Sequence, residues 1–269
     1  MGERIGLIAG AGNFPFLALA EAKKQGLVCV VAALRSQARP ELEERADAFD
    51  WFEPAELGRL AGFLKGRDVR RVLLAGKIDP GAIFKIEFPD EALRKLLARV
   101  PDKTSTSLIR ALIDYLAGQG LAVIDPALWL SPYFCPDGVL TATPPSAAVL
   151  EDIEFGWSKA RRLADEDIGQ TLVVKDQVLV AVEGLEGTDE TIKRAGRLAG
   201  AGIVVLKTAR TRQDMRIDVP AVGAETMRSL IRVAGAALCL EAGRVLFFDR
   251  EEAVALAEAN RIAVLTRTF

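Results

Sequence analysis

The stretch Ile5–Pro15, IGLIAGAGNFP, indicates the fold class of this chain. Its apolar run Ile5–Ala9 predicts a buried strand, and the pattern Phe14–Gln25 predicts a helix soon after it. Gly10 and Gly12 then lie in a tight turn between the strand and the helix. A strand, a glycine turn and a helix in this order are typical of a Rossmann-like α/β domain.

The same alternation continues along the first half of the chain. Strands are predicted at 27–33, 69–75 and 121–124, and helices at 54–65, 89–99 and 106–118. Because the strands are near-continuous apolar runs, they indicate a mostly parallel sheet that is covered on both faces. Residues 1–132 are therefore predicted to form an N-terminal Rossmann-like domain.

A proline-rich segment follows this domain and marks a boundary. Residues 131–146, SPYFCPDGVLTATPPS, contain four prolines, which break regular structure, so we place a linker at 133–146. Residues 147–269 are predicted to form a second α/β domain that carries the catalytic residues. Its predicted strands are 171–175, 178–183, 203–207, 245–248 and 262–265, and its helices are 147–163, 188–199, 224–234 and 250–259.

Composition restricts the chemistry that the chain can perform. Its 269 residues include no histidine. This excludes Ser-His-Asp catalysis, His-ligated zinc and the His-rich two-metal sites of calcineurin-like phosphoesterases. Acid–base chemistry is left to Asp, Glu, Lys, Tyr or bound water. The sequence thus predicts an enzyme that relies on carboxylates together with a divalent cation.

Charge and cysteine usage restrict partners and compartment. The 35 basic and 37 acidic residues give a formal net charge of −2, without the basic stripe that nucleic-acid binding needs. Cys29, Cys135 and Cys239 lack C-x-x-C spacing, which favours buried thiols in the cytosol. No apolar run approaches the roughly 20 residues of a membrane helix, and MGERIGLIAG is unlike a signal peptide. We expect a cytoplasmic protein whose membrane association is peripheral at most.

The glycine turn is the first candidate site. Gly10, Gly12 and Asn13 precede a helix N-terminus, where backbone N–H groups can bind a phosphate. Pro15 stands where the dinucleotide fingerprint needs a third glycine, so the motif does not support NAD, and a turn without a ligand would look the same. Lys77, after the strand 69–75, can neutralise a phosphate at the same edge of the sheet.

A second candidate lies in the loop EGLEGTD after the strand 178–183. Glu183 ends that strand beside two glycines, where its carboxylate is well placed to bind Mg²⁺. Thr188 and Asp189 open the next helix, and an N-cap role is a sufficient explanation for either of them alone.

The loop after the strand 203–207 is the richest candidate. Its cations, amide and acids are Lys207, Arg210, Gln213, Asp214, Arg216 and Asp218. Arginine and lysine match the oxygens of a diphosphate, and aspartates can bind a metal or accept a proton. A solvated charged loop is the alternative explanation, but Ile217 and Val219 give this loop apolar anchors that can fix its acids in position.

Five motifs, IGLIAGAGNFP, AGK, DIGQ, EGTDET and QDMRIDVPAVG, resemble those of one family in the same order along essentially the whole chain. It is the UDP-2,3-diacylglucosamine pyrophosphatases of lipid A biosynthesis, in their two-domain, non-calcineurin-like form. The resemblance implies hydrolysis to UMP and 2,3-diacylglucosamine 1-phosphate (lipid X), Mg²⁺ as cofactor, and an active site in the cleft between two domains. The family's essential aspartate lies in an R-hydrophobic-D-hydrophobic-P motif, which assigns that role to Asp218.

These expectations assign a role to each candidate residue. Catalysis is assigned to Asp218, Asp214 and Arg216, and the metal to Asp218, Asp189 and Glu183. Substrate binding is assigned to Gly10, Gly12, Asn13, Lys77, Thr188, Lys207, Arg210 and Gln213. Ser105 and Thr106 stand where members of the family commonly carry an acidic pair. The lipid-linked substrate implies peripheral contact with the inner membrane and an apolar stripe for its acyl chains, expected on the second domain. A homodimer is left open.

Two other functions compete with this hypothesis. A nucleotide-sugar oxidoreductase or transferase would fit the Rossmann-like start, but the glycine fingerprint is incomplete and Arg35, not an acid, ends the second strand. A non-catalytic sensor of a nucleotide-linked lipid would bind the same ligand without turnover.

Overall fold

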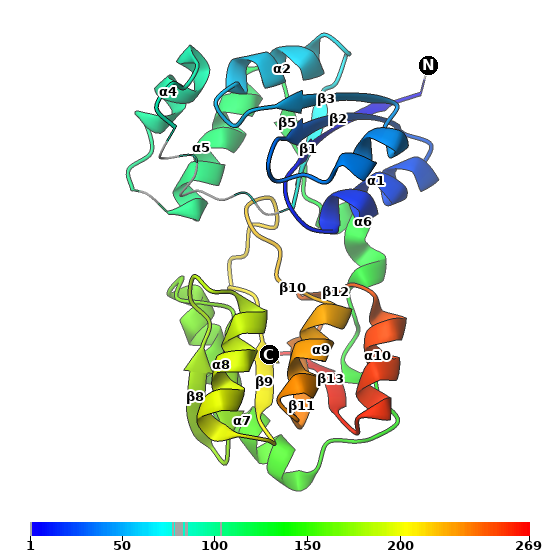
Figure 1. The fold of residues 1–269 in the computed structure, drawn as a ribbon, viewed down its shortest axis with the longest axis vertical. Coiled ribbons are helices and arrows are strands. Elements are labelled where there is room, and N and C mark those ends of the chain that lie inside the picture. The colour runs from blue at the N-terminus through cyan, green and yellow to red at the C-terminus, as the bar shows by residue number, and fades with distance from the viewer. Residues whose placement is uncertain (1, 77, 79–82, 84–85, 103) are drawn as a thin grey trace. The chain divides into compact units, whose positions relative to one another are not determined.

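The structure is a computed structural model that describes residues 2–76, 78, 83, 86–102 and 104–269 (Figure 1). The chain divides into two compact units, each with its own sheet. The first contains Met1–Leu130 and Asp214–Asp218, and the second contains Ser131–Gln213 and Val219–Phe269. No helix among the described residues is both long enough and apolar enough to cross a membrane.

The first unit contains a five-stranded sheet in the order β3-β2-β1-β4-β5, with every pairing parallel. The prediction of a Rossmann-like parallel sheet is thus confirmed. The buried strands are the continuous apolar runs, because both faces of the sheet are covered. The strands are β1 (Arg4–Ala9), β2 (Val28–Leu34), β3 (Ala48–Phe52), β4 (Arg71–Ala75) and β5 (Ala122–Val123).

Helices cover both faces of this sheet. Helix α1 (Phe14–Lys24) packs on one face, and α2 (Leu57–Lys65) and α5 (Ser105–Gly118) pack on the other. Helix α4 (Glu91–Leu97) packs against α2 and α5, and α6 (Ala127–Leu130) packs beside α1. Short 3₁₀ helices occupy Pro40–Arg45 and Ser131–Tyr133.

The second unit contains a six-stranded mixed sheet in the order β6-β13-β11-β9-β7-β8. Strands β9, β11 and β13 are parallel to one another, and the remaining pairings are antiparallel. The strands are β6 (Gly138–Val139), β7 (Thr171–Lys175), β8 (Val178–Val182), β9 (Val204–Lys207), β11 (Ala237–Glu241) and β13 (Ala263–Arg267). Short strands β10 (Ala221–Val222) and β12 (Leu246–Phe247) form a separate parallel pair.

The helices of the second unit also lie on two faces. Helix α7 (Ala147–Asp165) packs on one face, and α8 (Thr188–Ala199), α9 (Ala224–Arg232) and α10 (Arg250–Ala259) pack on the other. Gly156 allows α7 to approach the sheet closely, because a Cβ there would lie 2.4 Å from the Leu206 Cδ1 atom.

The predicted linker at 133–146 is built into the second unit. Strand β6 pairs with β13, the Cys135 thiol is buried in the core, and the Val264 N–H donates to the Thr141 hydroxyl at 3.0 Å. The prolines interrupt this segment, but an edge strand as short as β6 tolerates such interruptions. The boundary between the units therefore falls between Leu130 and Ser131.

Candidate functional site

The carboxyl end of β9 carries a buried polar cluster, which we call the Lys207 cluster. The Lys207 Nζ atom donates to the hydroxyls of Thr188, at 2.7 Å, and Thr171, at 3.0 Å. It also lies 3.5 Å from the Glu183 Oε2 atom, and the Thr188 hydroxyl donates to Glu183 Oε1 at 3.0 Å. Glu183 and Thr188 of one predicted candidate loop and Lys207 of another thus form one site.

Burial and attraction act against each other at Glu183. Its side chain is 14% exposed and that of Lys207 is 5% exposed. Desolvation by itself raises the pKa of the Glu183 carboxyl, but Lys207 and the hydroxyls of Thr171 and Thr188 outweigh it, so the pKa is lowered. The carboxylate therefore stays ionised at neutral pH, beside the buried Lys207 ammonium.

Helix α8 begins at the edge of this cluster. Its N-cap is Gly187, at φ 82°, so the Thr188 hydroxyl serves the cluster and does not cap the helix. Asp189 lies in the first turn, where its negative charge is favoured by the helix dipole. Its Oδ1 atom is buried and has no hydrogen-bond partner among the described residues.

The segment after β9 is fixed by its own polar contacts. The Arg210 N–H donates to Gln213 Oε1 at 3.1 Å, and the Arg210 guanidinium forms an ion pair with Asp167. Two residues assigned to substrate binding thus have partners in the same unit. The contact of Arg210 with Asp167 depends on packing that the local sequence does not reveal.

Residues Asp214–Asp218 form a turn that belongs to the first unit. The Ile217 N–H donates to the Asp214 carbonyl at 3.0 Å, and the Ile217 side chain packs against the apolar core beneath α2 and α5. The Asp214 carboxylate accepts from Arg216 through Nε at 2.9 Å, Nη2 at 2.7 Å and the backbone N–H at 3.0 Å. These bonds lower the pKa of Asp214. Asp218 is exposed at the end of the turn.

The backbone conformation of the glycine turn in the first unit is also closely constrained. Gly10 N–H donates to the Ala75 carbonyl at 2.8 Å, and a Cβ at Gly76, where φ is +95°, would lie 2.5 Å from the Ala11 carbonyl oxygen. Gly12 also has φ +95°, with open space where a Cβ would lie. The Asn13 Oδ1 atom accepts from Arg39 at 3.1 Å. Arg39 was not predicted, and Lys77 lies outside the described residues.

The first unit also contains two neighbouring cavities. One is a groove of about 500 Å³ between α4 and α5, with an apolar floor that includes Leu96, Ala111 and Tyr115 and with Arg99 and Arg110 among its lining residues. The other, of about 50 Å³, is lined almost entirely by aliphatic side chains and shares Leu96 with the groove. An apolar surface was expected on the second domain, whereas these cavities lie in the first unit.

Comparison with known proteins gives a match along nearly the whole chain. The family model of the LpxI N-terminal domain matches residues 4–132, and that of the LpxI C-terminal domain matches residues 136–265. The UDP-2,3-diacylglucosamine pyrophosphatase LpxI of Caulobacter vibrioides is 29% identical over 274 residues, which cover 98% of this chain and 97% of that protein.

Two solved structures that resemble the chain do so only distantly. WbmG of Bordetella bronchiseptica, solved in complex with NAD and UDP, is 11% identical with a TM-score of 0.34, over 100% of this chain and 73% of that one. A GalE-like L-threonine dehydrogenase of Cupriavidus necator is 10% identical with a TM-score of 0.33, over 99% of this chain and 86% of that one. Similarities this low carry no argument about function.

Proposed function

The chain belongs to the LpxI family, and from that premise we propose that it hydrolyses UDP-2,3-diacylglucosamine to UMP and 2,3-diacylglucosamine 1-phosphate, a step of lipid A biosynthesis. The observation that carries this proposal is the match of both family domains together with the curated pyrophosphatase over 98% of the chain. The Lys207 cluster and the turn with Asp218 supply the cation and the carboxylate that hydrolysis of a diphosphate needs.

The chemistry assigns one task to each group. Water attacks the phosphorus nearer the sugar, the anhydride P–O bond breaks, and the bridging oxygen leaves with UMP. Asp218 accepts the proton of the attacking water, since its carboxylate is exposed on an anchored turn. Lys207 holds phosphate oxygens and stabilises their charge in the transition state, where a buried cation acts strongly.

Mg²⁺ is compatible with the donors present. No group of three metal-ligating side chains occurs among the described residues, but Mg²⁺ usually uses only one or two carboxylates together with substrate phosphates and water. Asp189, whose buried Oδ1 atom lacks a partner within the described part of the chain, is the carboxylate of the second unit that would hold it. The ion would neutralise the diphosphate.

The direct test is release of UMP from UDP-2,3-diacylglucosamine by the purified full-length chain. We expect release that depends on Mg²⁺, stops on addition of a chelator and resumes when Mg²⁺ is restored, measured by chromatography of the nucleotide products. A control without enzyme fixes the background. Tight binding of the substrate without UMP would contradict the proposal and would favour the non-catalytic sensor. UMP release that continues in the presence of the chelator would contradict only the proposed role of Mg²⁺ and would leave the hydrolysis itself in place.

The acyl chains of this substrate need an apolar surface, which the α4–α5 groove offers. The groove extends along α5 from Ser107 to Gln119, about 18 Å at the rise of an α-helix. Its apolar floor can accept a hydrocarbon chain, and the adjoining aliphatic cavity extends the same surface past Leu96.

Filling this groove should discriminate between substrates by chain length. Gly118→Leu places a side chain in open space at the lining of the groove. We expect the KM for a long-chain substrate to rise by about tenfold, with a smaller rise for a short-chain analogue. Gly62→Leu in α2, where the space is also open, is the matched control and should leave both KM values unchanged. Equal effects of Gly118→Leu on both substrates would contradict binding of an acyl chain here.

A further inference from the structure

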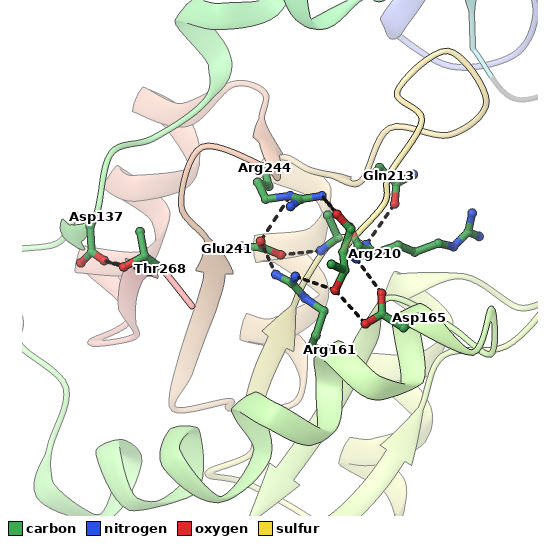
Figure 2. A network of polar contacts seen from close by, with 10 residues as sticks. Asp137, Arg161, Asp165, Arg210, Gln213, Glu241, Arg244 and Thr268 are labelled. Atoms are coloured by element: carbon green, nitrogen blue, oxygen red, sulfur yellow. Dashed lines mark hydrogen bonds and ion pairs between the residues drawn. The ribbon is translucent and has the colours of Figure 1, made fainter.

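A buried carboxylate at the end of the central strand β11 binds two arginines, and we call these three residues the Glu241 clamp (Figure 2). The Glu241 side chain is only 3% exposed and forms an ion pair with Arg161 of α7. Its Oε1 atom also lies 3.3 Å from the Nε atom of Arg244, which follows β11. None of these three residues was predicted from the sequence, and none has a role in the proposed hydrolysis.

The clamp binds the backbone of the segment that follows β9. The Ala209 N–H donates to Glu241 Oε2 at 2.8 Å. The Arg244 Nη2 atom donates to the carbonyl of Arg210 and, at 3.3 Å, to that of Thr211 (Figure 2). Three consecutive residues are thus held through one N–H and two carbonyl groups by side chains from another part of the sheet.

Helix α7 secures the same segment from a second direction. The Asp165 carboxylate accepts from the Thr211 N–H at 2.6 Å and from its hydroxyl at 2.8 Å. Arg161, which binds Glu241, also donates to the Thr211 hydroxyl at 3.2 Å. The pKa of Asp165 is lowered despite the opposing effect of burial, because the bonds from Thr211 and the charges of Arg161 and Arg244 favour its ionised form. The segment is therefore held in one conformation by charged groups on both sides.

Stability by itself does not explain this arrangement. A buried ion pair loses much of its hydration, so apolar residues of similar volume often stabilise a fold as well or better. What the clamp does specify is position, because the segment connects Lys207 of the Lys207 cluster with Asp214, the first residue of the turn that carries Asp218. A displacement of about 1 Å at a catalytic group can lower a rate by about 10²-fold.

We propose that Glu241, Arg161 and Arg244 are positioning residues of the hydrolase, which fix residues 209–211 within the segment whose two ends carry Lys207 and the turn with Asp218. The proposal rests on the proposed function, because the groups positioned are those assigned to phosphate binding and water activation. It makes the rate of hydrolysis depend on residues that do not contact the reacting atoms.

The test measures kinetics and amide hydrogen exchange on the same full-length proteins. For Glu241→Gln we expect kcat to fall by about 10²-fold, with KM within about threefold because the phosphate-binding cation remains. Amides of 209–213 should exchange faster, whereas those of β9 should not. Arg244→Lys, which keeps a positive charge but lacks the planar guanidinium, is the milder variant should Glu241→Gln fail to fold. It should change the same quantities in the same direction but by less.

Asp137→Asn is the control in the same unit. The Asp137 carboxylate accepts from the N–H and the hydroxyl of Thr268, each at 2.8 Å, and it holds no part of the segment (Figure 2). It should leave kcat and the exchange of 209–213 unchanged. Faster exchange with unchanged kcat, or lower kcat with unchanged exchange, would overturn the proposal. Failure of the proposed function is distinct, since the wild type would then release no UMP.

Discussion

Asp218→Asn is expected to lower the kcat for release of UMP by about 10²- to 10⁴-fold. Asparagine has nearly the same shape as aspartate, but its neutral amide cannot accept the proton of the attacking water and binds a cation poorly. The measurement is UMP release at saturating substrate, together with the Kd of the substrate. We expect that Kd to change little, because phosphate binding is assigned to Lys207.

The surroundings of Asp218 make this substitution informative. The residue is exposed, and the turn that carries it is anchored by Ile217 and by the bonds between Asp214 and Arg216, so the fold should tolerate the change. Asp68→Asn is the control, because Asp68 is a 92% exposed carboxylate in the turn before β4. An Asp218→Asn enzyme that keeps wild-type kcat would remove Asp218 from the mechanism while leaving the reaction itself in place.

Much of the fold could be predicted from local patterns. The buried strands β1, β2 and β4 are continuous apolar runs, and Asp176-Gln177 forms the turn between the predicted strands 171–175 and 178–183, with φ values of 50° and 58°. Strand β3 was missed because it is an edge strand whose residues are mostly half-buried, so its sequence lacks such a run. Strand β11 was missed because it is short and follows α9 closely, so that its sequence does not stand out from the helix.

Long-range packing could not be predicted in the same way. Residues 214–218 were assigned to the second domain by their position in the sequence, but the Ile217 side chain packs in the core of the first unit. Nothing in the local sequence distinguishes that core from the other one. The same limit concealed Glu241, since an acidic residue after an apolar run has the appearance of an ordinary strand end until its arginine partners are known.

The part of the candidate site that lies at the ends of strands could be predicted from the sequence. Glu183 and Lys207 were identified because ligands of open α/β sheets bind at the carboxyl ends of strands. Thr171 was missed because it begins a strand that runs antiparallel to β9. The register of β7 and β9 pairs Thr171 with Lys207, and the Glu183 N–H donates to the Thr171 carbonyl at 2.9 Å. The cluster thus depends on an antiparallel pairing that periodicity does not encode.

Lys207→Met should lower both stability and activity. Methionine keeps the length of the buried side chain but removes the ammonium, so the Glu183 carboxylate, 14% exposed, loses its charge partner. Removing one partner of a buried pair typically costs about 3–5 kcal/mol, and we expect the free energy of unfolding at pH 7 to fall by an amount near the lower end of that range. UMP release should also fall, because the phosphate-binding cation is gone. Denaturant unfolding and kcat measure the two effects.

The dependence of this stability loss on pH tests its electrostatic origin. In the wild type, the pKa of Glu183 is lowered below its unfolded value of about 4.3. This stabilises the protein above that pH, and the contribution is lost as the pH falls through the folded pKa. In the variant, Glu183 is buried without the ammonium, which should raise its pKa in the folded state above its pKa in the unfolded state. The variant therefore becomes more stable as the pH falls below 7 and Glu183 is protonated. The stability difference should therefore narrow between pH 7 and pH 4.

Lys175→Met provides the comparison for Lys207→Met. Lys175 is half-buried in the same sheet and donates to the Ala199 carbonyl at 2.8 Å, so its replacement removes a hydrogen bond to a neutral acceptor. We expect a loss of about 1 kcal/mol that varies little with pH, since no carboxylate depends on that bond. A stability loss in Lys207→Met that is equally independent of pH would mean that packing, and not the charge of Glu183, makes Lys207 necessary. If the stability difference from the wild type narrows at low pH only for Lys207→Met, then the Lys207 ammonium is what keeps the Glu183 carboxylate ionised.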